Sequence, residues 1–164
     1  MTAPRQQRKT LKILVLALGL PLAVMFGPPP VWAAGERVEV NPHTGLALSG
    51  FDPVAYFTDH RPRIGKPALE LSAEGAVWRF VNPGNRAAFE DHPEVYRPRF
   101  GGYDPVAVAR GAAVLGHPLF WAVVSERLYL FYSPDARHAF LADPGRVIAT
   151  AERKWPTVVH TIAR

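Results

Sequence analysis

The chain has 164 residues, of which 48% are hydrophobic and 20% are charged, values typical of a globular protein and not of a disordered one. Four of its 19 basic residues precede the first acid, Glu36, so the remaining sequence carries 15 basic and 14 acidic residues. This balance leaves no basic stripe and excludes a nucleic-acid-binding protein. The absence of cysteine excludes disulfides, thiol nucleophiles and cysteine-based zinc sites.

The N-terminus has the order of a secretory signal peptide. Basic residues extend to Lys12, an apolar run covers 13–26, and small residues follow at Ala33-Ala34. The apolar run contains Pro21 and is shorter than the ~20 residues that span a bilayer. We therefore predict a signal peptide over residues 1–33, export to the periplasm or beyond the cell, and no membrane span after cleavage. An uncleaved N-terminal anchor is the alternative.

Residues 34–164 are expected to form one domain from two degenerate copies of a unit of about 50 residues. The segment Gly-Phe-Asp-Pro-Val-Ala that begins at Gly50 recurs as Gly-Tyr-Asp-Pro-Val-Ala at Gly102. We place the first unit at about 50–101 and the second at about 102–155. Further pairs match at an offset of 51 residues: Trp78 with Tyr129, Phe80 with Phe131, Arg86 with Arg137, Phe89 with Phe140, and Pro93 with Pro144.

Each unit is predicted to run helix, β-hairpin, helix, helix, which gives an α+β fold. Asp52 and Asp104 can cap a short helix with proline at its first position. Alternating strands are expected at 68–72 and 77–80, and again at 120–124 and 128–132. Helices should follow to Asp91 and Ala142, and new helical pieces should start at Pro93 and Pro144. An N-terminal hairpin (37–40 with 46–48) and a C-terminal helix (146–162), kinked or broken before Pro156, complete the prediction.

Several motifs resemble the YHS domain family, part of the broader TRASH group associated with heavy-metal trafficking, resistance and sensing. The aromatic strand that ends at Ser133, the helix centred on Phe140 and the following Asp143-Pro144 carry this resemblance. Exported bacterial members are similar over a longer stretch, from about Glu36 to the end of the chain. The motifs that support this are Gly50 to Phe57, Asn85-Arg86-Ala87-Ala88-Phe89, Gly101-Gly102-Tyr103 and Trp155-Pro156.

The chain departs from this family at its ligand positions. The thiols of metal-binding members correspond to Tyr132 and Ala136, whose first-unit counterparts are Val81 and Asn85. Many exported members also have a cysteine or selenocysteine where this chain has Asp104. Because soft metal ions select sulfur ligands, we predict that thiolate binding of copper, mercury or zinc is lost.

The remaining candidate ligands are histidines and arginines. His92, His117 and His138 are the candidate metal ligands, although no two histidines show the short spacing of a local metal site. Capping or surface roles are the alternative for them. Arg86 and Arg137 occupy the same helix position in both units and are the candidate anion ligands. Their alternative role is structural, as ion pairs or as long side chains covering the edge of the core.

No catalytic motif stands out, and no cofactor is predicted. Asp52 and Asp104 are explained as helix caps, and Trp78, Phe80, Phe89, Tyr129, Phe131 and Phe140 as core residues. Nucleophile-elbow, phosphate-binding and dinucleotide patterns are absent. The sequence thus favours an exported, non-catalytic binding or accessory module for an unknown small ligand or protein. The alternatives are a periplasmic metal-handling protein with histidine and carboxylate ligands, or an enzyme with an unrecognised site.

Overall fold

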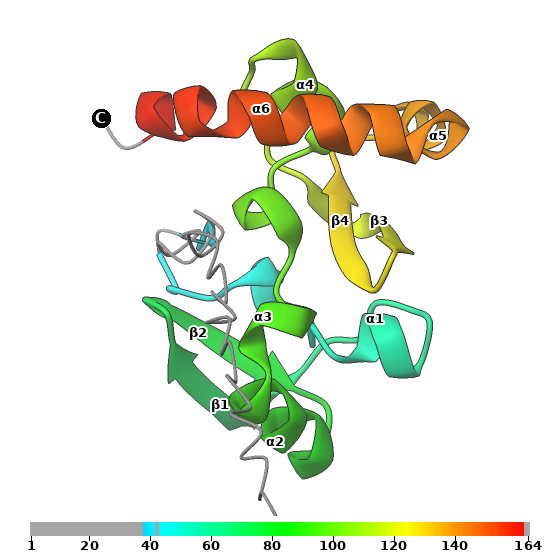
Figure 1. The fold of residues 1–164 in the computed structure, drawn as a ribbon. Helices are drawn as coiled ribbons and strands as arrows, with labels where there is room; N and C mark the ends of the chain where they lie inside the picture. The colour runs from blue at the N-terminus through cyan, green and yellow to red at the C-terminus, as the bar shows by residue number, and fades with distance from the viewer. Residues whose placement is uncertain (1–37, 42, 163–164) are drawn as a thin grey trace, which may run out of the picture. The chain divides into compact units, whose positions relative to one another are not determined.

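The structure, a computed structural model, describes residues 38–41 and 43–162. All of them belong to the unit Val31–Arg164, and the predicted signal peptide at 1–33 lies outside the described residues. They form an α+β fold with two separate antiparallel β-hairpins, as the sequence predicts (Figure 1). No helix in this part of the chain is long and apolar enough to cross a membrane.

The elements of the two predicted units follow one another in the same order. The first unit contains η2 (Leu48–Gly50), α1 (Ala55–Thr58), β1 (Lys66–Ala73), β2 (Ala76–Phe80), α2 (Pro83–Asp91) and α3 (Pro93–Tyr96). The second contains η3 (Arg99–Gly102), α4 (Pro105–Arg110), β3 (His117–Val124), β4 (Arg127–Phe131), α5 (Pro134–Ala142) and α6 (Pro144–Ile162). The helices that end at Asp91 and Ala142 have the predicted bounds.

The two hairpins share one register. Leu71 pairs with Trp78 in the first, and Ala122 pairs with Tyr129 in the second, 51 residues later. Each first strand has an irregularity between its first residue and the regular ladder. Both central turn residues have positive φ in each hairpin, which is the geometry of a tight type I′ turn. Rigid superposition of the two units stays a prediction, but their pairing patterns are the same.

Equivalent caps start the helices that follow the hairpins. The Asn82 side-chain oxygen accepts from the backbone N–H of Asn85 at 2.8 Å, and the Ser133 hydroxyl accepts from that of Ala136 at 3.2 Å. Proline stands at the start of both helices, where its missing N–H costs nothing. The sequence Asn/Ser-Pro therefore determines where α2 and α5 begin.

The aromatic side chains divide into two hydrophobic cores. In the first core, Phe89 lies against Trp78 and Phe80, with ring centroids 4.5 and 5.5 Å away. In the second, Phe140 packs against two rings of β4 at 5.0 Å each. All six rings predicted as core are buried: Trp78, Phe80, Phe89, Tyr129, Phe131 and Phe140.

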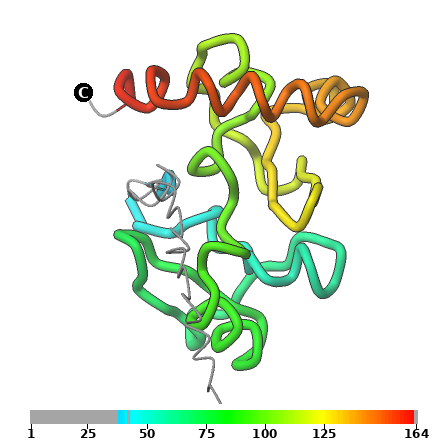
Figure 2. Tube along the Cα trace, in the orientation of Figure 1, coloured from blue at the N-terminus to red at the C-terminus, as the bar shows by residue number. Residues whose placement is uncertain are grey.

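Strand β4 contributes to both cores. Leu128 and Leu130 belong to the first, whereas Tyr129 and Phe131 belong to the second. This division follows from the alternation of side chains along a strand. Helix α6 packs against the second core and contacts α4 and α5. Figure 2 shows its path as the orange to red end of the described chain.

The predicted N-terminal hairpin is not formed as two paired strands. Within the described residues of this segment, a single antiparallel bridge joins Val40 to Ala47. Leu46 instead forms a parallel bridge with Val77, and the Ala47 N–H donates to the Val77 carbonyl at 2.9 Å. The second arm therefore adds to the edge of β2, because that edge offers unpaired backbone groups. Arg37, at the start of the first arm, lies outside the described residues.

Two helix predictions also need correction. Helix α1 begins at Ala55 and not at Pro53, although Asp52 still accepts hydrogen bonds from the turn that leads into it. Helix α6 starts at Pro144, not at Arg146, and continues through Pro156 to Ile162, so the predicted break is not formed, whereas the predicted kink is not tested by this continuity. Proline inside a helix removes one hydrogen bond, and burial of Ala151 and Val158 on either side of it offsets that loss.

Candidate functional site

The carboxylate of Asp52 organises the first unit. It is completely buried. Its Oδ1 accepts from the backbone N–H groups of Val54 at 2.8 Å and Ala55 at 3.3 Å. Its Oδ2 accepts from the backbone N–H of Val81 at 2.8 Å and from the side-chain amide of Asn85 at 2.7 Å. One side chain therefore ties the turn before α1 to the end of β2 and to the first turn of α2.

Asp104 has the same position in the second unit but fewer partners. It is 2% exposed. Its Oδ1 accepts from the backbone N–H of Val106 at 2.8 Å, and its Oδ2 accepts from that of Tyr132 at 3.0 Å. The counterpart of Asn85 is Ala136, which has no side-chain donor. The Asp104 carboxylate thus lacks the side-chain hydrogen bond that completes the first-unit network.

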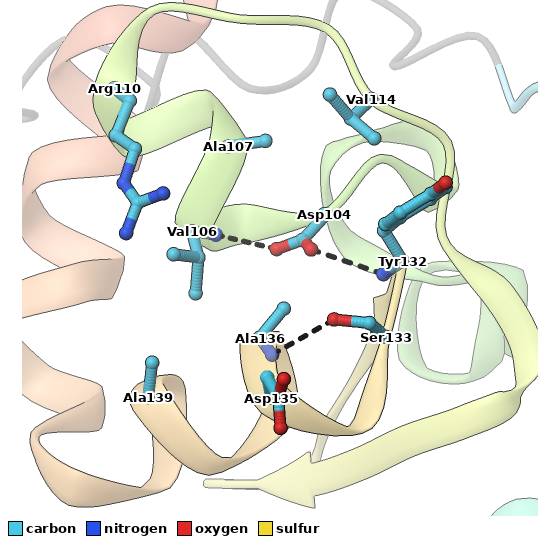
Figure 3. A pocket seen from close by; sticks show the side chains of 10 residues that line it. All are labelled: Asp104, Val106, Ala107, Arg110, Val114, Tyr132, Ser133, Asp135, Ala136 and Ala139. Atoms are coloured by element: carbon cyan, nitrogen blue, oxygen red, sulfur yellow. Dashed lines mark hydrogen bonds between the residues drawn. The ribbon is translucent and has the colours of Figure 1, made fainter.

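A cavity of about 450 Å³ lies beside Asp104, between α4, the end of β4 and the start of α5. It is open to solvent. Figure 3 shows the carboxylate of Asp104 and the methyl group of Ala136 in its wall. The lining combines apolar and polar side chains: Asp104, Val106, Ala107, Arg110, Val114, Tyr132, Ser133, Asp135, Ala136 and Ala139. Its volume is in the range of small-molecule sites.

A second, smaller cavity of about 270 Å³ adjoins the first, since Val106, Arg110 and Ala139 line both. Arg146 and Thr150 of α6 contribute to its other side. Asp104 and Asp135 line the first cavity, Arg146 lines the second, and Arg110 lines both.

The two candidate anion ligands, Arg86 and Arg137, have repeated structural contacts. The Nε of Arg86 donates to the Glu70 carbonyl at 3.1 Å, and the Nε of Arg137 donates to the Trp121 carbonyl at 2.6 Å. Glu70 in β1 and Trp121 in β3 are equivalent residues: each is the first regularly paired residue after the irregularity of its strand. Neither arginine is among the residues that line the two cavities. Their positions support the structural alternative and give no support to an anion site.

The candidate metal ligands do not converge. His92 is exposed, and its Nδ1 lies 3.5 Å from a Glu94 carboxylate oxygen. The Nδ1 of His117 accepts from the backbone N–H of Leu119 at 3.2 Å, and His138 is exposed on α5. Among residues 38–41 and 43–162, no three histidine, aspartate or glutamate side chains come together as a potential metal site. Metal binding by these histidines stays a prediction without a geometric basis.

Sequence reasoning missed Arg110 and Asp135 as cavity residues and assigned Asp104 only a capping role. One signal was present. When the two units are aligned, an aspartate precedes proline in both, at Asp52 and Asp104. The position of Asn85, the amide partner of Asp52, is occupied by Ala136 in the second unit. A buried carboxylate that keeps its backbone partners and loses its side-chain partner has an acceptor position without a protein donor.

Comparison with known proteins gives no further assignment. No protein-family model, curated protein or solved structure matches this chain. The site must therefore be interpreted from its own chemistry.

Proposed function

We propose that this protein is an exported, non-catalytic binding module of the YHS type, whose ligand site is the cavity beside Asp104. The observation that carries the proposal is that cavity of about 450 Å³, which has apolar walls and a buried carboxylate in its lining. Tyr132 and Ala136, at the positions of the thiols in metal-binding YHS members, line it as well. This location supports a ligand site at the same place as in the metal-binding members, with different ligand chemistry.

A screen for ligand-dependent stabilisation tests the binding function. Amino acids, amides, polyamines, sugars and organic acids are added singly to the purified protein, and the Tm is measured. A ligand present at 100 times its Kd stabilises the folded state by about 2.7 kcal/mol. We expect at least one compound to raise the Tm and to shift the backbone amide resonances of Val106 and Tyr132.

A pair of variants locates the binding. Ala139→Trp places a ring in the cavity and should remove the stabilisation, because Ala139 lines it. Ala142→Trp makes the same change at an exposed position of α5 that does not line the cavity, so binding should persist. Equal responses of the two variants, or a screen without any stabilising compound, would contradict the proposal.

Export is tested separately. Intact-mass measurement of the periplasmic fraction should show a mature chain that begins at Ala34 or Gly35, after the small residues that end the predicted signal. Leu16→Arg places a charge in the apolar run and should keep the precursor in the cytoplasm. A full-length protein embedded in the membrane would show that the N-terminus is an anchor.

Thiolate-type metal binding is not part of the proposed function. The only sulfur atoms of the chain belong to Met1 and Met25, both within the predicted signal peptide. Because Cu(I) and Hg(II) select sulfur and strong zinc sites need several converging ligands, we expect no tight site for any of these ions. Calorimetric titration of tag-free protein checks this. A stoichiometric site tighter than about 10⁻⁹ M, which corresponds to roughly 12 kcal/mol, would favour the metal-handling alternative.

A further inference from the structure

We infer that the cavity beside Asp104 binds a small molecule through an N–H donor group, a carboxamide or a protonated amine, that donates to Oδ2 of Asp104. The inference rests on the proposed function and specifies the chemical class of its ligand.

The first unit contains the same interaction within the protein. There, the Asn85 side-chain amide donates to Oδ2 of Asp52 at 2.7 Å while the backbone N–H of Val81 donates to the same oxygen at 2.8 Å. In the second unit, Tyr132 supplies the equivalent backbone N–H to Asp104 at 3.0 Å, and Ala136 supplies no amide. The carboxamide of Asn85 is therefore an internal stand-in for the ligand that Asp104 can receive.

Asp104 retains the capacity for this bond. A carboxylate oxygen can accept two hydrogen bonds, and Oδ2 of Asp104 accepts one from the protein. Every buried side-chain oxygen and nitrogen of the described residues has at least one hydrogen-bond partner, so folding does not depend on a ligand at Asp104. Asp104 is 2% exposed as a residue and lines the cavity, so a donor that reaches Oδ2 gains a charge-assisted hydrogen bond.

Ser133, another polar residue of the cavity, fits a carboxamide ligand. In the first unit, the Asn82 side-chain amide donates to Oδ1 of Asn85 at 3.2 Å. Ser133 replaces Asn82 in the second unit, and its hydroxyl accepts from Ala136 and keeps its own proton to donate to a carboxamide oxygen. Asp135 in the lining favours an amine that carries a positive charge, whereas the Arg110 guanidinium in the same lining opposes it and favours a neutral carboxamide. Val106, Ala107 and Ala139 form apolar walls that can contact the alkyl part of such a molecule.

Paired probes test this chemistry on the unaltered protein. Acetamide is compared with N,N-dimethylacetamide, and methylammonium chloride with tetramethylammonium chloride, by following backbone amide resonances in ¹⁵N–¹H correlation spectra. We expect saturable shifts at Val106, Tyr132 and Ala136 for at least one N–H-bearing probe. Its fully methylated counterpart should bind at least about tenfold more weakly, because it has no N–H group to donate to Asp104.

A matched pair of substitutions gives a second test. Ala136→Asn rebuilds the first-unit arrangement, so the new side chain should occupy the ligand position, raise the Tm and abolish probe binding. Ala87→Asn makes the same change at an exposed site on α2 and should leave binding intact. Equal binding of methylated and unmethylated probes, or unchanged binding by the Ala136→Asn protein, overturns the inference.

Failure of this inference is distinguishable from failure of the proposed function. If compounds from the broader screen bind in the cavity but none depends on an N–H donor, the binding module stands and the assigned ligand class is wrong. If nothing binds in the cavity, both are wrong.

Discussion

One buried aspartate in each unit connects distant segments of the chain, three in the case of Asp52 and two in the case of Asp104. Asp52 and Asp104 both precede proline, and both accept from a backbone N–H two residues later and from the end of the second hairpin strand. Asp52 additionally accepts from Ala55 and Asn85, so it has four donors where Asp104 has two. The same residue type is thus fully used for structure in one unit and partly available for binding in the other.

The difference in donor number predicts a difference in stability. In Asp52→Asn, the new amide nitrogen replaces one carboxylate oxygen and faces donors, so we expect a loss of about 3 kcal/mol in the free energy of unfolding. In Asp104→Asn, fewer donors lose their acceptor and the open cavity allows the side chain to adjust, so about 1–2 kcal/mol is expected. Urea denaturation of both variants measures the gap. Equal losses would mean that the additional Ala55 and Asn85 contacts contribute nothing.

The repeated arginines give a second prediction at the residue level. Arg86 and Arg137 hold a strand carbonyl with Nε, a geometry that lysine cannot reproduce. Arg86→Lys and Arg137→Lys should each destabilise the fold by about 0.5–1.5 kcal/mol. Ligand binding in the Asp104 cavity should be unchanged, since neither residue lines it. Loss of binding with unaltered stability would restore the anion-site hypothesis.

At the level of elements, the loop that leads into each hairpin passes close to the backbone of the second hairpin strand. Gly65 donates its N–H to the Gly50 carbonyl and Gly116 donates its N–H to the Gly102 carbonyl, both at 2.9 Å. A Cβ atom on Gly116 would lie 2.5 Å from Cβ of Leu130 and 2.8 Å from the Gly102 oxygen. Only glycine allows the backbone to pass this close to β4, and the same holds for Gly65 against β2.

Because of this close approach, we expect the effect of a Gly→Ala substitution on the free energy of unfolding to depend strongly on its position. Gly116→Ala and Gly65→Ala should each lower the free energy of unfolding by about 1–3 kcal/mol or prevent folding, because backbone atoms have to move. Gly145→Ala is the matched control, since its Cβ would meet nothing within 4 Å and alanine favours the helix there. Thermal denaturation of the three variants distinguishes them. A neutral Gly116→Ala would show that the loop does not pass as described.

At the level of the whole described region, β4 and Tyr56 connect the two cores. Leu128 and Leu130 of β4 enter the first core. Tyr56, which is completely buried in that core, donates its hydroxyl to the Pro118 carbonyl of β3 at 3.0 Å and packs edge-on against Trp121. The second hairpin is therefore part of the first core, so we expect the two units to unfold together.

Buried tyrosines predict how this stability depends on pH. Burial raises the pKa of Tyr56, with a further contribution from the charge of Asp52. Burial, together with the charge of Glu39, raises the pKa of Tyr103 to about 12. Both tyrosines ionise near pH 10 in an unfolded chain, so their stabilisation is complete below pH 10 and is lost as the pH rises through the folded-state values.

The free energy of unfolding should therefore fall between about pH 10 and 12. Tyr103→Phe should flatten this decline, because phenylalanine has no proton to lose. The variant also lacks the Tyr103–Glu39 hydrogen bond of 3.1 Å. Its free energy of unfolding at pH 7, compared with that of the unaltered protein, measures this separate loss. Urea titrations across this range measure both effects. A decline of the same slope in the variant would exclude Tyr103 as a source.

The sequence alone determined the local structure of this protein. Periodicity, capping residues and prolines specified the α+β class, both hairpins and the ends of α2 and α5 at Asp91 and Ala142. These signals act over a few residues, and they recur in both units at the same offset. The core assignment of Phe89 and Phe140 also followed from their place in the repeat.

Only the tertiary structure decided what depends on contacts between distant residues. The segment at Leu46 joined the edge of β2 and kept only a single bridge to the first arm of its own predicted hairpin. Helix α6 continued through Pro156 because its apolar face is buried. The cavity depends on Asp104, Ala136 and the path of α4, which the sequence separates. A hollow is the space that packing leaves unfilled, so it is defined by the side chains around it and has no local sequence signal.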